Sequence, residues 1–382
     1  MPDKFLIAVE LRGAGIHPHA WRREDSRAEE LFTAQYWTDH IEAADRAGID
    51  IAFLPDAFAL QSGDGVELGR IEAAAIAARA AAGTRSIGLV PTVTVTHTEP
   101  FHVSKQIASI DYASSGRAGW EVAVSQDADE ATLFGRKGPQ TVDELWNEAD
   151  DAAEVVTRLW DSWEDDAEIR DASTGRFIDR DKLHYIDFEG DYFSVKGPSI
   201  TPRPPQGQPI VVVRAEDDPS TAVAAKRADI ARISAPTIDD AAVVAARVRR
   251  AVVAEGRDPA EVHVVLDLEV HVSDTAAADV DQLNSWSPYV PDSVSFRGNA
   301  AELQELLDGL AASGVVDGVT LRPLALAQSV EAITTDVVPG LAWHDGATPR
   351  LRPGPLLRSR LGLARPENRY AVRRQAAQGA SK

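Results

Sequence analysis

Two histidines are the side chains of this sequence best suited to carry a proton near neutral pH. His17 follows an apolar run at residues 4–11, and His97 follows another at residues 86–95. An imidazole of ordinary pKa changes its charge between about pH 5 and 8, so either side chain could serve as a general acid or base. The chain contains no cysteine, which excludes disulfides, thiolate nucleophiles and thiolate metal sites.

Other polar side chains occur where apolar runs end. Asp56 closes the second run, Thr92 and Thr94 lie in the third, and Ser125 closes the fourth. In a parallel barrel the carboxyl ends of the strands carry the active site, so we expect these side chains to lie on one rim with His17. For any one of them alone, a structural role is the alternative. The spacing of the histidines matches no metal-binding pattern, and we expect no metal site.

Eight apolar runs have the length and composition of buried strands, and helical patterns separate most of them. Continuously apolar strands that alternate with helices favour an α/β fold, the (β/α)8 TIM barrel, with a doubly wound open sheet as the alternative. The predicted strands span residues 4–11, 49–56, 86–95, 118–125, 209–215, 228–234, 262–270 and 317–323. The clearest predicted helices span residues 69–83, 101–113, 143–160, 239–256 and 299–314.

The predicted barrel domain covers residues 1–345, and two segments depart from its alternation of strands and helices. Residues 164–208 form a predicted insertion after the fourth strand, either a lid over the active site or an excursion on the side of the barrel. Residues 346–382 form a tail rich in proline, glycine and arginine, which includes Arg350 and Arg352. This basic tail is expected to dock on the acidic surface of its own chain or of a neighbouring subunit, with disorder as the alternative.

The formal net charge of −21 disfavours nucleic acid and anionic membranes as partners, because the body of the protein repels both at long range. The first twenty residues show no signal-peptide pattern, and no apolar run approaches the length of a membrane span. We therefore expect a cytoplasmic protein without a nucleic-acid or membrane partner.

The stretch "RAEDDPST" (214–221) is a predicted turn from a strand into an alanine-rich helix. Helix N-termini in such turns commonly bind phosphate through free backbone amides. Here Asp218 is the predicted N-cap, with a proline as the first helical residue, so the helix end is satisfied from within. The three carboxylates at 216–218 would also repel a phosphate dianion, and the turn is predicted to fill the place of a phosphate site. Arg214, Ser220 and Thr221 are the side chains that could still reach a phosphate.

Several stretches, in order along nearly the whole chain, resemble the nitrilotriacetate and dibenzothiophene sulfone monooxygenase branch of the bacterial luciferase-like flavin enzymes. The resemblance implies a TIM barrel that takes reduced FMN from a separate flavin reductase and uses oxygen to oxidise a small organic substrate. It also implies a homodimer or homotetramer, and it leaves the deazaflavin F420 as an alternative cofactor. The stretches are "GIHPHAWR", "DIAFLPD", "HTEPFHVSKQIASIDYASSGRAGWEVAVS", "LWDSWEDDA", "YFSVKGPSITPRPPQGQPIV" and "LLRSRLGLARPENRY".

By this resemblance, Asp56, Thr92, Thr94 and Ser125 match positions beside the flavin, and His17 matches a position beside flavin and substrate. The chain departs from the family pattern at the cofactor. Glu121 replaces an asparagine, an arginine–tyrosine pair is Leu145–Trp146, and "RAEDDPST" replaces a glycine-containing phosphate motif. Two hypotheses follow: a two-component flavin monooxygenase, or a paralogue that has lost the flavin site and acts as a non-catalytic partner or binding subunit.

Overall fold

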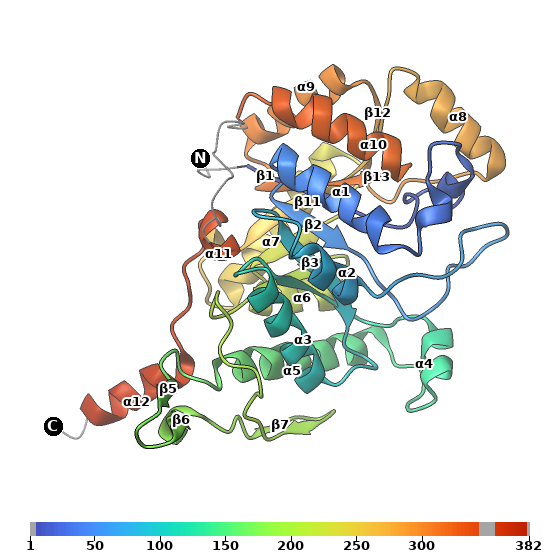
Figure 1. The fold of residues 1–382 in the computed structure, drawn as a ribbon. Coiled ribbons are helices and arrows are strands. Elements are labelled where there is room, and N and C mark those ends of the chain that lie inside the picture. The colour runs from blue at the N-terminus through green and yellow to red at the C-terminus, as the bar shows by residue number, and fades with distance from the viewer. Residues whose placement is uncertain (1–4, 344–355, 380–382) are drawn as a thin grey trace.

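The computed structural model describes residues 5–343 and 356–379, and eight parallel strands form a closed barrel at its centre (Figure 1). Each strand pairs with its neighbour in chain order, and β1 pairs with β13 to close the ring. The fold class predicted from the sequence is therefore confirmed. The barrel strands are β1 (Leu6–Glu10), β2 (Ile51–Leu54), β3 (Gly88–Thr94), β4 (Gly119–Ala123), β9 (Ile210–Arg214), β10 (Ile230–Ile233), β11 (His263–Val272) and β13 (Gly318–Pro323).

Helices surround the barrel, and their ends follow local capping chemistry. Thr33 caps α1 and accepts from the Tyr36 amide, while Thr141 and Glu144 form a reciprocal capping box at the start of α5. The outer helices are α1 (Ala34–Ala47), α2 (Ala73–Ala80), α3 (Pro100–Ala113), α4 (Ala128–Phe134), α5 (Val142–Asp161), α6 (Asp218–Arg227), α7 (Ile238–Ala254), α8 (Ala276–Trp286), α9 (Ala300–Ser313) and α10 (Leu326–Ala332). No helix in the described part of the chain is both long and apolar enough to span a membrane.

One strand lies outside the predicted pattern. β12 (Val294–Gly298) pairs in parallel with the last five residues of β11, Leu268–Val272, beyond the point where β11 pairs with β10. β11 is ten residues long and pairs with three strands: β10 along its first part, β12 along its last part, and β13 along its other edge. The extension raises the wall of the barrel at its C-terminal rim.

The barrel interior has two layers of different chemistry. Its lower half, at the N-terminal ends of the strands, is apolar and is completed by three leucines of the C-terminal segment, whose short helix α11 (Leu357–Arg360) lies there. Its upper half carries charged side chains, described below. The lower apolar residues are Leu6, Ala8, Ile51, Phe53, Val90, Ile210, Val212, Ile230, Val265, Leu357, Leu361 and Leu363.

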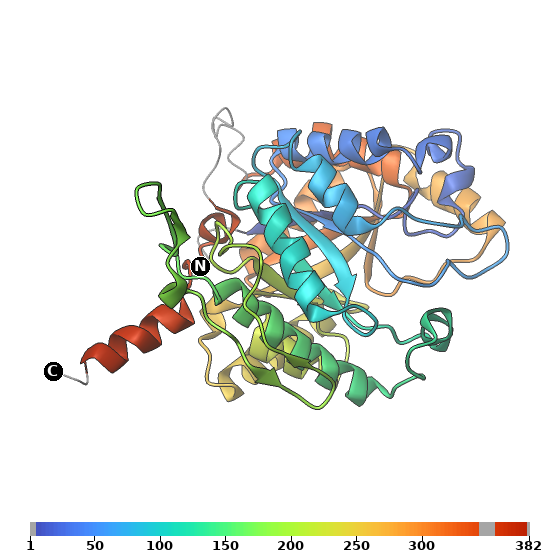
Figure 2. The same cartoon turned by 60° about the horizontal axis from the view of Figure 1, so that its bottom comes forward.

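The segment at 164–208 carries two small antiparallel sheets, β5 (Glu168–Asp171) with β6 (Arg176–Ile178) and β7 (Phe188–Glu189) with β8 (Ser194–Val195). It lies beside α12 (Arg369–Gly379) in both ribbon views (Figures 1 and 2). None of its residues lines the cavity described below. In this structure the segment is therefore an excursion on the side of the barrel and not a lid.

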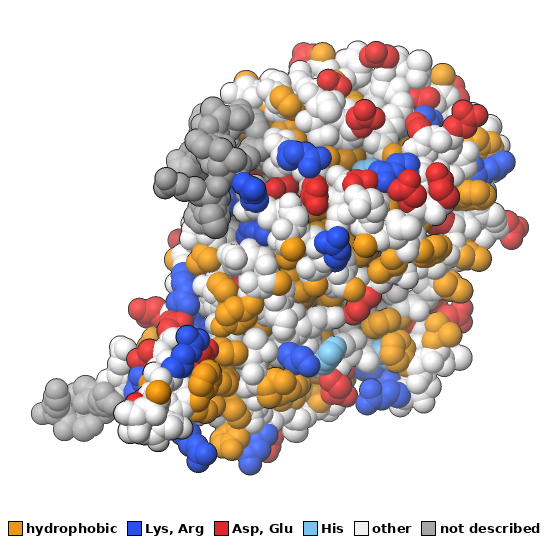
Figure 3. Space-filling view, in the orientation of Figure 1, with side chains coloured by type: hydrophobic (Ala, Val, Ile, Leu, Met, Phe, Trp, Pro, Cys, Tyr) orange, Lys and Arg blue, Asp and Glu red, His pale blue; other side chains and the backbone are white. Residues whose placement is uncertain are grey.

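The described part of the C-terminal segment packs on its own chain through ion pairs. Arg358 contacts Asp229 at 2.7 Å, Arg365 contacts Asp165 at 2.7 Å, and further arginines contact other acids. Figure 3 shows basic and acidic side chains interspersed along this segment. Arg350 and Arg352 lie outside the described residues.

Candidate functional site

A cavity of about 500 Å³ opens at the C-terminal ends of β1 to β4 and β9. This is the rim at which barrel enzymes bind their ligands, and the volume is typical of a small-molecule site. The loop after β1 and the long loop between β2 and α2 cover it. Among the predicted site residues, His17, Asp56, Thr92 and Arg214 line the cavity, whereas His97, Thr94, Ser125 and Ser220 do not.

The loop after β1 brings His17 to the cavity wall. Gly13 has a φ of +48°, and a Cβ there would lie 1.7 Å from the Glu67 carboxylate, so the close approach requires glycine. The His17 ring is buried, with Nδ1 accepting from the His19 amide at 3.1 Å and Nε2 lying 3.2 Å from the Ser287 carbonyl oxygen. Burial lowers the pKa of His17 to about 4. The imidazole is therefore neutral at pH 7, and both of its nitrogens are bonded.

His97 lies apart from this wall. Its ring stacks on Phe134 with centroids 4.6 Å apart, and neither ring nitrogen has a hydrogen-bond partner among the described residues. Burial, followed by the nearby charge of Lys137, lowers the pKa of His97. The structure does not bring the two predicted proton carriers together.

Asp56 and Thr92 lie on the cavity wall. Asp56 accepts from the Ala57 amide and from the Ala73 amide at the start of α2, each at 2.9 Å, and burial nevertheless raises the pKa of Asp56. Thr92 donates to Glu121 at 2.8 Å. Both side chains therefore already have partners within the chain.

Thr94 and Ser125 are buried near the ends of β3 and β4. The Ser125 amide donates to Thr96 Oγ1 at 3.0 Å, and the Ser125 hydroxyl has no partner among the described residues. Their placement beside a flavin, which the resemblance implied, stays a prediction.

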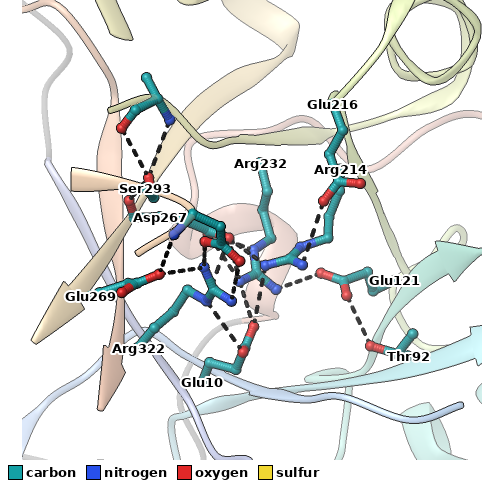
Figure 4. Close-up of polar contacts among 12 residues, drawn as sticks. Glu10, Thr92, Glu121, Arg214, Glu216, Arg232, Asp267, Glu269, Ser293 and Arg322 are labelled. Atoms are coloured by element: carbon teal, nitrogen blue, oxygen red, sulfur yellow. Dashed lines mark hydrogen bonds and ion pairs between the residues drawn. The ribbon is translucent and has the colours of Figure 1, made fainter. Parts of the chain in front are cut away.

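Beneath the cavity, the upper half of the barrel interior holds an ionic network (Figure 4). Arg232 is its centre: Nε donates to Asp267 at 2.9 Å, and the two Nη atoms donate to Glu121 and Glu10, each at 2.6 Å. The Arg232 guanidinium also lies 4.3 Å from the centroid of the Phe53 ring. The network comprises Glu10, Glu121, Arg214, Arg232, Asp267, Glu269, Asp292 and Arg322.

The acids of the network differ in their protonation. Burial acts to raise the pKa of Glu10, but Arg232, Arg322 and Arg214 outweigh it and hold that pKa well below its usual range. Burial raises the pKa of Glu269 to about 7, although its Oε1 accepts from the Asp292 amide and the Tyr289 hydroxyl. The second oxygen of Glu269 has no partner among the described residues. Glu269 therefore titrates near neutral pH in a fully buried position.

The sequence analysis missed all of this network except Arg214 and Glu121. Its members come from six barrel strands and from the loop before β12, and Glu10 and Arg322 are 312 residues apart. A usable signal existed: a charged residue near the C-terminal end of an otherwise apolar strand, as in "IARI", "LDLEV" and "TLRP". Such residues point into the barrel when they share the alternation of the buried side chains.

The turn from β9 into α6 is closed by its own side chains. The N-cap is Asp217 and not Asp218, and Pro219 is the second helical residue, because the Asp217 carboxylate accepts from the Ser220 amide at 2.8 Å. The Ser220 hydroxyl accepts from the amides of Glu216 at 3.0 Å and Asp217 at 2.9 Å. No amide in this group is left free for a ligand.

Arg214 and Ser220, which the sequence suggested as phosphate ligands, are both engaged within the chain. Arg214 turns into the barrel, where it bonds Asp267 and lies 3.5 Å from Glu10. Ser220 is buried within the capping box. Leu145 and Trp146 stand where the family pattern has an arginine–tyrosine pair. Both are buried side chains of α5, which packs against α6.

Among the described residues, no group of three or more His, Cys, Asp or Glu side chains is placed to hold a metal ion.

Comparison with known proteins gives a consistent result. The model of the family described as luciferase-like monooxygenase matches residues 15–332. N-acetyl-S-(2-succino)cysteine monooxygenase of Bacillus subtilis (strain 168) is 30% identical over 351 residues, which cover 91% of this chain and 78% of the relative. Nitrilotriacetate monooxygenase component A of Aminobacter aminovorans is 31% identical over 300 residues, which cover 75% of this chain and 65% of the relative.

Solved structures agree with this assignment at the level of the fold. The EDTA monooxygenase of Chelativorans sp. BNC1 superposes with a TM-score of 0.82 at 22% identity, covering 95% of this chain and 99% of that one. The resemblance stated from the sequence is thus confirmed. The chain is an oxidoreductase and belongs to the luciferase-like monooxygenase family.

Proposed function

We propose that this chain is a cytoplasmic flavin-dependent monooxygenase that receives reduced flavin from a separate reductase and oxidises a small organic substrate with O2. The observation that carries the proposal is the cavity at the C-terminal rim, lined by Asp56, Thr92 and His17. The relative from Aminobacter supports the two-component arrangement, because its name describes one component of a monooxygenase. We also propose that the chain is a homodimer or homotetramer.

The residues present fit the ring of FMN but not its phosphate. A cavity of about 500 Å³ has room for a planar tricyclic ring, and Asp56, Thr92 and Arg214 are the polar groups that would face it. In the turn at 214–221, the amides of Glu216, Asp217 and Ser220 are already bonded within the chain. When bound, a reduced flavin supplies the electrons that activate oxygen.

The chain itself would orient the ligands and exclude water. The loops after β1 and β2 cover the cavity, and Glu130 fixes the second loop by accepting from the Phe58 and Ala59 amides, each at 3.0 Å. His17 is neutral and bonded on both sides, so it holds the wall in this structure. To accept a proton it must first release the His19 amide from Nδ1, and to donate one to a ligand it must release the Ser287 carbonyl oxygen from Nε2.

The test is an anaerobic titration of the purified protein with reduced FMN, reduced riboflavin and reduced F420. We expect micromolar binding of a reduced flavin, weakened at least about tenfold by Thr92→Val with Asp56→Asn at the ring face. The matched control is Ser162→Ala. Ser162 is the buried C-cap of α5 and does not line the cavity. A protein that binds none of the three would contradict the proposal and favour the non-catalytic partner subunit.

A flavin reductase and a panel of small substrates then complete the test. Substrate-dependent oxygen consumption that requires the reductase is the expected result, and light scattering reports the oligomeric state. Substrate-dependent oxygen consumption that proceeds without the reductase, on a flavin that stays bound to the protein, would contradict the two-component arrangement.

A further inference from the structure

The amides around the cavity are already bonded to carboxylates of the chain itself. Asp56 holds the amide of Ala73 at the start of α2, and Glu67 holds the Ala14 amide at 3.0 Å. Glu130 holds the amides of Phe58 and Ala59. In each case a built-in carboxylate lies where a bound anion would otherwise receive its hydrogen bonds.

The same arrangement occurs in the turn that follows Arg214, which itself lines the cavity. At the N-terminus of α6 the Asp217 carboxylate and the Ser220 hydroxyl together take the amides of Glu216, Asp217 and Ser220. Glu216 lies within 3.6 Å of Arg214 and adds a further negative charge beside the turn. A phosphate approaching this helix would find these three amides already bonded, and it would meet the carboxylates of Glu216 and Asp217.

The charged side chains of the cavity wall do not reverse this balance. Six carboxylates line it (Glu10, Asp56, Glu67, Glu121, Asp127 and Glu130), against three arginines (Arg12, Arg70 and Arg214). Arg214 is engaged by the acids of the ionic network, and Arg70 donates to the Ala59 carbonyl at 2.9 Å. Glu10 and Glu121 are likewise engaged by Arg232, and the lining charges outside the network are four carboxylates against two arginines, an excess of negative charge.

The hydrogen bonding of one of these carboxylates, Glu130, indicates a ligand that donates hydrogen bonds. The Glu130 side chain lines the cavity and is only 4% exposed, and its Oε2 atom has no partner among the described residues. A buried carboxylate oxygen is costly to leave unpaired. An N–H group of a ligand would satisfy it, whereas a phosphate oxygen would repel it.

We infer that the cavity binds the flavin by its ring alone and gives the phosphate no site, so that a phosphate-free flavin binds at least as tightly as FMN. The ring carries an N–H donor, whereas the phosphate, which riboflavin lacks, adds negative charge and further acceptor oxygens. This inference rests on the proposed function, since it concerns the same site and the same class of ligand.

The first experiment compares riboflavin and FMN, both reduced and both oxidised, by anaerobic titration of the full chain. We expect the ratio of the FMN dissociation constant to that of riboflavin to be one or more. The ratio should fall toward one as salt rises from roughly 0.05 to 0.5 M, because salt screens the repulsion. If FMN binds about tenfold tighter than riboflavin, the inference is wrong and the proposed function stands. If neither flavin binds, both are wrong.

A variant locates the effect. Glu216→Gln with Asp217→Asn removes both carboxylates and keeps a good N-cap on α6. We expect FMN to bind about three- to tenfold tighter while riboflavin binding is unchanged. The matched control, Glu255→Gln with Glu261→Gln, removes the same net charge at the opposite end of the barrel, where both side chains are exposed. An unchanged ratio in the first variant, or an equal change in the control, would overturn the assignment of this turn.

Discussion

The lower and upper halves of the barrel interior are built from the same strands by opposite means. Below, Phe53, Val212 and their neighbours pack as a continuous apolar layer that α11 completes. Above, the next inward positions of the strands carry Arg232 and its acids, which are equally buried. Apolar burial stabilises a fold directly, whereas a buried ionic network loses hydration that its internal attraction only offsets. The ionic network in the upper half holds Glu121 and Arg214, which line the cavity, in fixed positions.

Removing the centre of the network should have the largest effect. Arg232→Met leaves Glu10, Glu121 and Asp267 buried without their shared cation, and we expect the free energy of unfolding to fall by about 3–5 kcal/mol. Urea denaturation at pH 7 measures it. Arg170→Met, which removes an exposed pair with Glu168, is the control and should cost less than about 1 kcal/mol. A loss below about 1 kcal/mol for Arg232→Met would show that the network is hydrated in solution.

A change in the lower half should separate stability from binding. Leu357→Ala removes a fully buried side chain from the apolar layer, and we expect a loss of about 3 kcal/mol in unfolding free energy. Flavin affinity should not change, because this layer lies at the end of the barrel away from the cavity. Val243→Ala, at an exposed position of α7, should change stability by less than about 0.5 kcal/mol. Weaker flavin binding in folded Leu357→Ala would mean that the two halves are coupled.

The network also predicts a pH dependence. The pKa of Glu269 rises from its ordinary value of 4.5 to about 7 on folding, so the folded state binds this proton more tightly than the unfolded chain. Its stabilisation is fully present below about pH 4.5 and is lost as the pH rises through about 7.

Glu269→Gln abolishes this titration, and relative to the wild type it should gain on the order of 2 kcal/mol between pH 4.5 and pH 8. Denaturation of both proteins at the two pH values measures the gain. Glu305→Gln, at an exposed position of α9, should show no such change. A difference between Glu269→Gln and the wild type that does not vary with pH would mean that Glu269 stays ionised when folded.

The smallest effect should come from the helix caps. Asp217→Ala removes the carboxylate that holds the start of α6 and should cost about 1 kcal/mol in unfolding free energy. Thr141→Ala removes the equivalent group of α5 and should cost a similar amount. If Asp217→Ala is instead stabilising, the carboxylate is held there against local repulsion, which would strengthen its assignment as a barrier to phosphate.

The barrel could be predicted from the sequence because each strand is an apolar run bounded by polar residues, and all eight runs became strands. β12 was missed, since "VSFRG" is short and only half-buried. The cap of α6 was misplaced by one residue, because three consecutive acids offer equivalent carboxylates and only the backbone geometry selects Asp217. Such boundaries depend on contacts that a local pattern does not contain.

The candidate site could be predicted only in part. Asp56 and Thr92 reached the cavity because they follow strand ends, a position that topology alone fixes. His17 and His97 were grouped by their chemistry, but loop conformation separates them. The ionic network needs eight side chains brought together from across the chain, and no single segment shows more than one or two of them.

The place of α11 has a consequence for how the protein is made. Leu357, Leu361 and Leu363 complete the lower apolar layer, yet they follow all eight barrel strands in the sequence. A nascent chain that has already produced all eight strands still has an open floor, with apolar side chains in contact with water. The barrel therefore reaches its final packing only once residues 357–363 have also been synthesised and have docked against the strands.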